Sequence, residues 1–154
     1  MTGLIANGNS NNENVVISSG SFFPCISSKA IREALRFDSS VTNQRLIHAI
    51  ENAIIEVNER LESLTSKAAS LAELSTKTIT TDGVEKPVTE VLYFRAVASA
   101  VGAEITEKYR AYDTNNNGGQ KADDLTPTVD DYHRELRFAI RDLKKIRRLN
   151  VELI

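Results

Sequence analysis

Residues 42–64, TNQRLIHAIENAIIEVNERLESL, decide how this chain folds. Their apolar side chains recur at steps of three and four residues, which predicts an amphipathic helix with one buried face. Thr42 is a good N-cap, and at about 1.5 Å per residue the helix spans about 33 Å, which is long for a small protein. The predicted buried face consists of Leu46, Ile50, Ala53, Ile54, Val57, Leu61 and Leu64.

Three further helices are predicted, one before this helix in the sequence and two after it. The first runs from Ser27 or Ser28 to about Phe37, because a serine hydroxyl can accept hydrogen bonds from the free amides of a first turn. The next covers about residues 88–112, and the last opens at Thr126-Pro127, with the proline in the first turn. The expected buried positions of these two helices are Val91, Phe94, Ala98, Val101, Ile105, Tyr109 and Tyr112, then Val129, Tyr132, Leu136, Ile140, Leu143 and Ile146. We therefore expect an all-α fold, a four-helix bundle-like domain with three long helices.

The remaining segments divide the chain into three parts. Residues 1–21 are rich in Asn, Gly and Ser and predict a flexible N-terminal arm, ended by Phe22-Phe23-Pro24, whose rings should anchor onto the helices of the domain at 22–149. Residues 150–154 form an apolar tail that packs on its own bundle or adds to the edge of a neighbour's sheet. Between the long helices, Thr78-Ile79-Thr80 is compatible with a short strand, and whether residues 76–87 form a hairpin stays open.

Composition excludes several classes of protein. A length of 154 residues fits one domain, and a net charge of −2 argues against a general nucleic-acid binder. No apolar run approaches the roughly 20 residues of a membrane span, and the N-terminus has no secretory signal, so we expect no membrane partner. Cys25 is the only cysteine, which rules out an intramolecular disulfide, and it is expected to be a small apolar filler.

Residues 113–124, DTNNNGGQKADD, partly match the calcium-binding loop of an EF-hand. Asp113, Asn115 and Asn117 occupy ligand positions one, three and five, and Gly118 occupies position six. Asp124 stands where a bidentate glutamate is expected, and a lysine and a glutamine occupy other unsuitable positions. A polar connector between helices explains the same residues, so we predict no metal site here.

Nothing else in the sequence predicts catalysis or a cofactor. His48 and His133 lie in different predicted helices, without a ligand partner at metal-binding spacing. The pairs Asp123-Asp124 and Asp130-Asp131 flank a helix start, where carboxylates cap the helix and complement its dipole. There is no glycine-rich phosphate loop, and the chain is therefore predicted not to be an enzyme.

A basic cluster at the end of the last predicted helix is the strongest charge feature. Positive charge at a helix C-terminus interacts favourably with the helix dipole even where the helix end faces only solvent. The same charge also suits contact with an acidic partner surface or with DNA that threads a channel. The cluster consists of Arg137, Arg141, Lys144, Lys145, Arg147 and Arg148.

The stretch VVISSGSFFPCIS at residues 15–27 resembles the opening of the GPL family, the head completion proteins of temperate, contractile-tailed phages. The likeness continues through IREALRFD at 31–38, VTNQRL at 41–46 and AIIEVNE at 53–59. It returns at LYFRAV (92–97), EKYRAYDT (107–114), FAIRDL (138–143) and VELI (151–154). The departures, an asparagine-rich N-terminus and the loop at 115–119, fall outside the helices.

This resemblance implies a structural protein of the virion neck, a head–tail connector (adaptor) assembled in the bacterial host cytoplasm. It would bind the phage portal protein after DNA packaging, retain the genome and provide the platform for tail attachment. Its implied partners are the portal, a tail-terminator or neck protein, copies of itself in a ring of about twelve by analogy, and packaged DNA. A non-virion helical assembly factor or regulator is the alternative. The candidate partner-binding residues are Phe22, Phe23, Arg141, Lys144, Lys145, Arg147, Arg148, Val151, Leu153 and Ile154.

Overall fold

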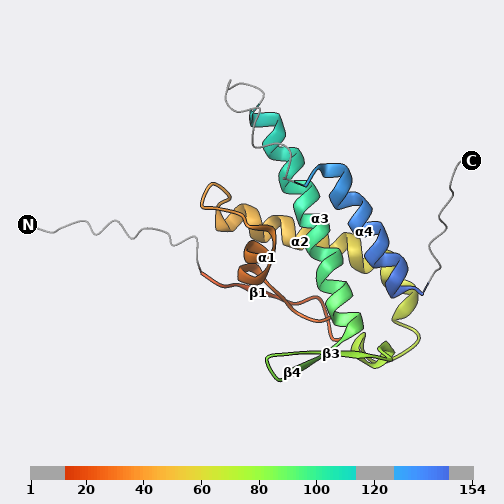
Figure 1. The fold of residues 1–154 in the computed structure, drawn as a ribbon. Coiled ribbons are helices and arrows are strands. Elements are labelled where there is room, and N and C mark those ends of the chain that lie inside the picture. The colour runs from red at the N-terminus through yellow and green to blue at the C-terminus, as the bar shows by residue number, and fades with distance from the viewer. Residues whose placement is uncertain (1–12, 114–126, 146–154) are drawn as a thin grey trace, which may run out of the picture.

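A computed structural model describes residues 13–113 and 127–145, without the side chains of residues 109–113 (Figure 1). Four α-helices make up most of this part of the chain, and short strands and 3₁₀ turns connect them. The elements in chain order are β1 (Val16–Ile17), β2 (Ile26–Ser27), α1 (Ser28–Leu35), α2 (Asn43–Leu61), η1 (Glu62–Leu64), η2 (Ala72–Leu74), β3 (Thr78–Thr81), β4 (Val84–Pro87), α3 (Val88–Asp113) and α4 (Val129–Leu143).

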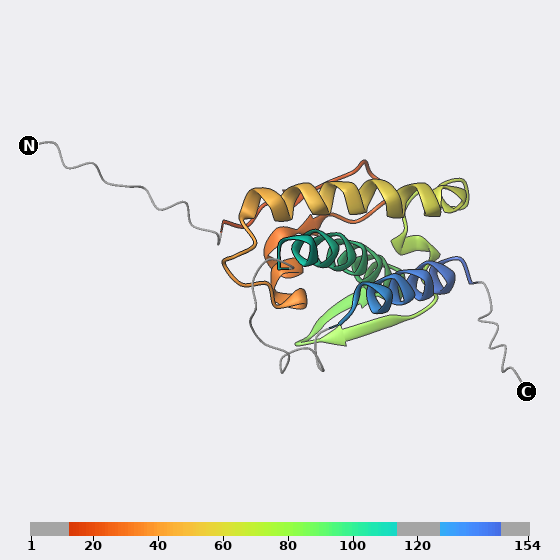
Figure 2. The same ribbon diagram turned by 90° about the horizontal axis from the view of Figure 1, so that it is seen from above.

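Helix α3 is the centre of the molecule. Figure 2 shows α2 on one side of it and α4 on the other. Residues 96–103, AVASAVGA, are all buried, as expected for a helix covered on several sides. The predicted stripe on α3 was therefore too narrow: Ala98, Val101 and Ile105 are buried as expected, but Val91 is 36% exposed and Tyr93 is fully buried.

Small side chains on α3 let α4 approach closely. A Cβ atom added to Gly102 would lie 2.5 Å from Cε1 of Tyr132, which is closer than two carbon atoms can pack. Gly102 therefore provides the space into which the Tyr132 ring fits. On α4 itself, Leu136, Ile140 and Leu143 are buried as predicted.

The prediction of an all-α fold was wrong, because the described residues also contain two antiparallel two-stranded sheets. In the first, Ile17 pairs with Ile26; in the second, Thr81 pairs with Val84 across a two-residue turn. Asp82 and Gly83 have φ angles of 51° and 76°, and positive φ at both positions defines the turn type that matches the twist of a hairpin. The Asp-Gly pair thus closes a hairpin, and the strand expected at residues 78–80 is confirmed within β3.

The helix ends follow the predicted caps with two corrections. Ser27 and Thr42 are the N-caps of α1 and α2, and the buried face of α2 continues through η1 to Leu64. Helix α4 begins two residues later than predicted: Thr128 is its N-cap, so Pro127 precedes the helix. At its other end α4 stops at Leu143, so the lysines expected in its last turn cap the helix or follow it.

The described part of the predicted N-terminal arm is tied to the helices. The hydroxyl of buried Ser28 accepts a hydrogen bond from the Val15 amide at 2.9 Å. Phe23 is 9% exposed and stacks on the ring of Tyr93 with centroids 5.2 Å apart, while Phe22 packs edge-on against Phe23. The predicted anchoring of both rings on the core is therefore confirmed.

Candidate docking surfaces

The candidate partner-binding residues fall into separate regions of the structure. Phe22 and Phe23 lie in the N-terminal segment against the core, and Arg141, Lys144 and Lys145 lie together at the end of α4. The remaining candidates are outside the described residues: Arg147, Arg148, Val151, Leu153 and Ile154. Because Phe23 is buried within its own chain, a substitution there would act on the fold before it acted on a partner.

The basic end of α4, which we define as Arg137, Arg141, Lys144 and Lys145, is the predicted surface that the structure does bring together. Arg137 and Arg141 are exposed and one helical turn apart, and Lys144 is the C-cap. Within the described residues none of these four forms an ion pair, whereas Arg134 nearby is held 2.7 Å from the carboxylate of Asp131. The basic end therefore presents positive charge that its own described neighbours do not neutralise.

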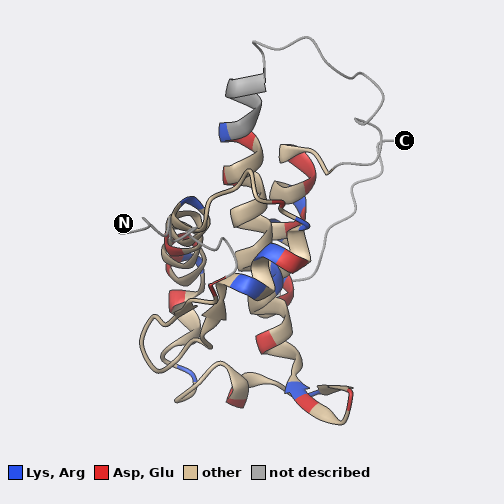
Figure 3. Ribbon diagram, turned by 90° about the vertical axis from the view of Figure 1, so that its left-hand side faces the viewer, with Lys and Arg blue, Asp and Glu red and all other residues tan. Residues whose placement is uncertain are grey.

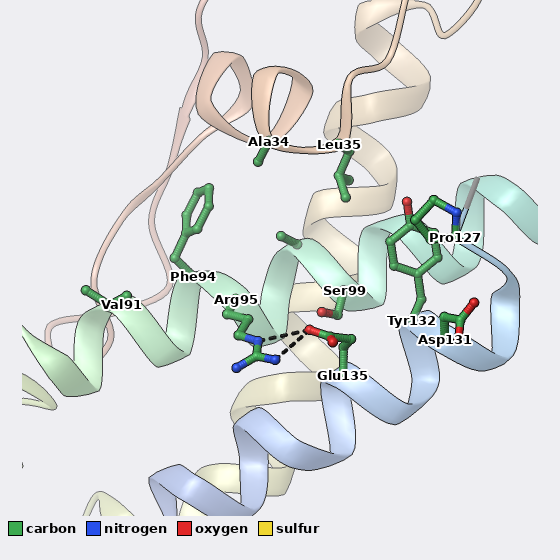
Figure 4. Close-up of a pocket in the computed structure, with 11 residues that line it drawn as sticks. Ala34, Leu35, Val91, Phe94, Arg95, Ser99, Pro127, Asp131, Tyr132 and Glu135 are labelled. Carbon is green, nitrogen blue, oxygen red and sulfur yellow. Dashed lines mark hydrogen bonds and ion pairs between the residues drawn. The ribbon is translucent and has the colours of Figure 1, made fainter. Parts of the chain in front are cut away.

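A groove between α1, α3 and α4 was not predicted from the sequence (Figure 4). It is open and has a volume of about 700 Å³. The guanidinium group of Arg95 donates two hydrogen bonds to one carboxylate oxygen of Glu135, at 2.7 and 3.0 Å, across the interface of α3 and α4. The lining residues are Ala34, Leu35, Val91, Phe94, Arg95, Ala98, Ser99, Pro127, Asp131, Tyr132 and Glu135.

The charged groups of this groove serve the fold. The carboxylate of Asp131 accepts hydrogen bonds from the backbone amide and from the hydroxyl of Thr128. Both lower the pKa of this carboxyl group, and the bond from the backbone amide has the larger effect. Burial raises the pKa of the Tyr132 hydroxyl, which disfavours the ionised phenolate. Because Asp131 caps α4 and Glu135 pairs with Arg95, the groove suits contact with an apolar segment better than acid–base chemistry.

The β3–β4 hairpin is the second surface that the sequence did not identify. All residues of the two strands are exposed except Pro87, which is half-buried at the start of α3. Ile79 and Val84 are 47% and 57% exposed, and their register places both on one face of the ladder. The Asp82-Gly83 pair was the available sequence signal for this element, since such a pair between β-prone residues is typical of a tight hairpin.

Metal and membrane features give no further site in the part of the chain that the structure describes. No three His, Cys, Asp or Glu side chains there are grouped so as to hold a metal ion. His48 is exposed beside Glu51, with 3.8 Å between Nδ1 and the carboxylate. The loop compared with an EF-hand lies almost wholly outside the described residues. No described helix combines the length and hydropathy needed to cross a membrane.

Comparison with known proteins gives the family. The model of the phage head completion protein (GPL) family matches residues 17–154, which include all four helices and both sheets apart from one residue of β1. The chain belongs to this family. The head completion/stabilization protein of Escherichia phage P2 is 30% identical over 126 residues, which cover 81% of this chain and 75% of that relative. No solved structure matches the chain.

The family match confirms the resemblance found in the sequence. A head completion protein has a structural role in assembly of the phage head, and such a role requires contacts with other phage proteins. The matched residues include the basic end of α4, the groove and the β3–β4 hairpin. Exposed charge and exposed apolar side chains on this head completion protein are therefore candidate contacts for assembly.

Proposed function

We propose that this head completion protein binds the portal vertex after DNA packaging, retains the genome and forms the platform to which the tail attaches. The observation that carries the proposal is the basic end of α4, where the chain leaves the helical domain toward residues 146–154. Positive charge beside an apolar terminal segment combines electrostatic steering with apolar contact, which is how many assembly interfaces are built.

In this proposal the two ends of the chain have different tasks. Val151, Leu153 and Ile154 contact the portal, and Arg147 and Arg148 precede these residues in the sequence. Phe22 and Phe23 act indirectly, since they hold the N-terminal segment in place on the core. Copies of the protein form a ring at the neck, of about twelve by analogy with related connectors.

The β3–β4 hairpin supplies a second contact in this proposal. Its exposed apolar face, formed by Ile79 and Val84, would pack against a tail-terminator or neck protein. A two-stranded hairpin with little packing of its own gains stability when a partner covers one of its faces.

Deletion of residues 150–154 tests the portal contact. The truncated chain is expected to stay folded, with an unchanged thermal transition, and to lose binding to purified portal in a pull-down assay. A matched variant of full length, V151S/L153S/I154S, separates loss of the apolar side chains from loss of chain length and is expected to fail in the same way. Normal portal binding by both variants would contradict the assignment of residues 150–154 to the portal contact.

A further inference from the structure

The outward face of α2 carries acidic residues around an exposed isoleucine. Glu51, Ile55 and Glu59 follow one another at four-residue steps, so they lie on one side of the helix, and Glu62 continues this side in η1. Ile55 is 67% exposed, although it lies in the middle of the longest helix of the N-terminal half. We call Glu51, Ile55, Glu59 and Glu62 the acidic face of α2.

The acidic face of α2 has few neutralising contacts in its own chain. The carboxylate of Glu51 lies 3.8 Å from an exposed histidine, and neither Glu59 nor Glu62 forms an ion pair with a described residue. By contrast, Glu56, which lies off this side, pairs with Arg60 at 2.6 Å. The glutamates around Ile55 are thus left facing solvent.

The acidic face of α2 and the basic end of α4 lie on two helices that both pack on α3 and also contact each other. Figure 2 shows α2 and α4 on different sides of α3, and Figure 3 shows acidic and basic residues distributed over several of the helices. Since both helices bury their apolar sides toward α3, their charged sides face away from each other. Within the described part of one chain no ion pair joins the two surfaces, so both remain available to a second copy.

We propose that the acidic face of α2 in one copy binds the basic end of α4 in a second copy, head to tail. The surfaces have opposite charge, and the alkyl stems of Arg137 and Arg141 can cover the exposed Ile55. Such an interface uses two different surfaces, so each copy keeps one surface free for the next and the contacts propagate into a ring or filament. The inference rests on the proposed function and names the partner of its basic surface.

DNA is a poorer occupant of the basic end of α4. The chain has a net charge of −2, and a duplex lying against one basic patch would gain little from the rest of the surface. A second copy supplies three glutamates around an isoleucine, which match the arginines in both charge and apolar stem. Charge complementarity within the same sequence therefore favours self-association.

Charge reversal of the purified full-length chain tests this inference. Sedimentation velocity over a range of concentrations at low salt is expected to show self-association that weakens as salt is added. E51K/E59K and R137E/R141E are each expected to weaken association on the order of a hundredfold, because like charges then face each other. Thermal melts should stay close to the wild type, since all four side chains are exposed.

Two rescues make the test specific. A chain that carries all four substitutions has both surfaces reversed and should associate again, and an equimolar mixture of E51K/E59K with R137E/R141E should form complexes that neither forms alone. The matched control K67E/K77E changes two exposed lysines elsewhere and should associate like the wild type. A wild-type chain that stays monomeric at all concentrations, or reversed chains that associate without loss, would overturn the inference.

The portal pull-down, repeated with R137E/R141E, separates this inference from the proposed function. Portal binding by a charge-reversed chain that no longer self-associates supports the head-to-tail contact and restricts the portal contact of the proposed function to residues 151–154, without a part for Arg137 and Arg141. Intact self-association of R137E/R141E overturns the head-to-tail contact and leaves the portal proposal standing.

Discussion

The two small sheets of this protein have the same architecture and very different surroundings. Both are antiparallel pairs of strands, yet β1–β2 lies against the core through Ile26, which is 1% exposed, whereas every residue of β3 is exposed. The first sheet draws the N-terminal segment onto the helices. The second projects from the start of α3 and holds almost no apolar surface against its own chain (Figure 1). The comparison shows that a β-hairpin on a helical domain can serve the fold or remain available to a partner.

Polar contacts strengthen this difference. Beneath β1–β2, the Tyr93 hydroxyl donates to the side-chain oxygen of Asn58 at 2.8 Å, and the Asn58 amide donates to Ser19 at 2.8 Å. The hydrogen bonds of the other hairpin are solvent-exposed, such as that between Thr78 and Glu85. Exposed hydrogen bonds contribute less to stability than buried ones whose loss would strand a polar group.

The largest expected effect is that of Phe23→Ala. The ring is buried against Tyr93, so its removal leaves a cavity and should lower the free energy of unfolding by about 3–5 kcal/mol. Urea unfolding followed by circular dichroism measures this change. The matched substitution Ile79→Ala in the other hairpin should cost less than about 0.5 kcal/mol; equal costs would contradict the comparison.

Tyr93→Phe should have the next largest effect and lower the free energy of unfolding by about 1–2 kcal/mol, because it leaves the side-chain oxygen of Asn58 without its hydrogen-bond donor. Burial raises the pKa of Tyr93 to about 12, above the usual value of 10.0. The folded state therefore favours the neutral phenol; its contribution is complete below pH 10 and is lost as the pH rises toward 12. Ultraviolet titration should show one late-ionising tyrosine fewer in Y93F than in the wild type, since Tyr132 keeps its raised pKa in both, and equal late steps would refute the assignment.

Two glycines allow a matched test of the connections. Gly20 and Gly83 have φ angles of 81° and 76°, and a Cβ atom at either position would meet no other atom within 4 Å. Alanine at each should therefore cost about 1 kcal/mol through backbone strain alone. Gly20→Ala should lower global stability, whereas Gly83→Ala should mainly accelerate amide hydrogen exchange within residues 78–87. Global destabilisation of equal size by both would show that the second hairpin is coupled to the core.

The smallest effect on stability is expected for the double substitution I79S/V84S. Both side chains are exposed, so the free energy of unfolding should change by less than about 0.5 kcal/mol. If this hairpin contacts a neck partner, incorporation of the variant into phage particles should still fall several-fold relative to T78S/T80S, a control on the opposite face of β3. Undiminished incorporation would remove the hairpin from the proposed contacts.

The helices were predictable from sequence because each is long and periodic, and Ser27 and Thr42 marked two starts correctly. The β1–β2 sheet was not predicted, since strands of two residues carry no periodicity, and of the β3–β4 hairpin only a short strand at residues 78–80 was considered. The Asp82-Gly83 signal was present, but its threonine-rich surroundings also fit a loop. Helix α3 was assigned one buried side because the sequence does not show that α2 and α4 cover it from different sides. That arrangement depends on tertiary packing.

Prediction of the docking surfaces follows the same pattern. The basic end of α4 could be recognised because its residues are adjacent in sequence, and the structure adds that they lack described ion-pair partners. The groove joins residues from α1, α3 and α4, so no local sequence pattern predicts it. The acidic face of α2 was not identified from the sequence, although its residues follow at four-residue steps, because its relation to the basic end depends on how α2 and α4 pack on α3.

Cryo-electron microscopy of purified virions, with reconstruction focused on the neck and peptide mass spectrometry of the same particles, tests the central claim most directly. The account predicts a ring of this helical protein beneath the portal, with its peptides present at low copy number. Absence of its peptides from mature virions would contradict a structural place in the particle, and an assembly factor that leaves before completion would then be the better description.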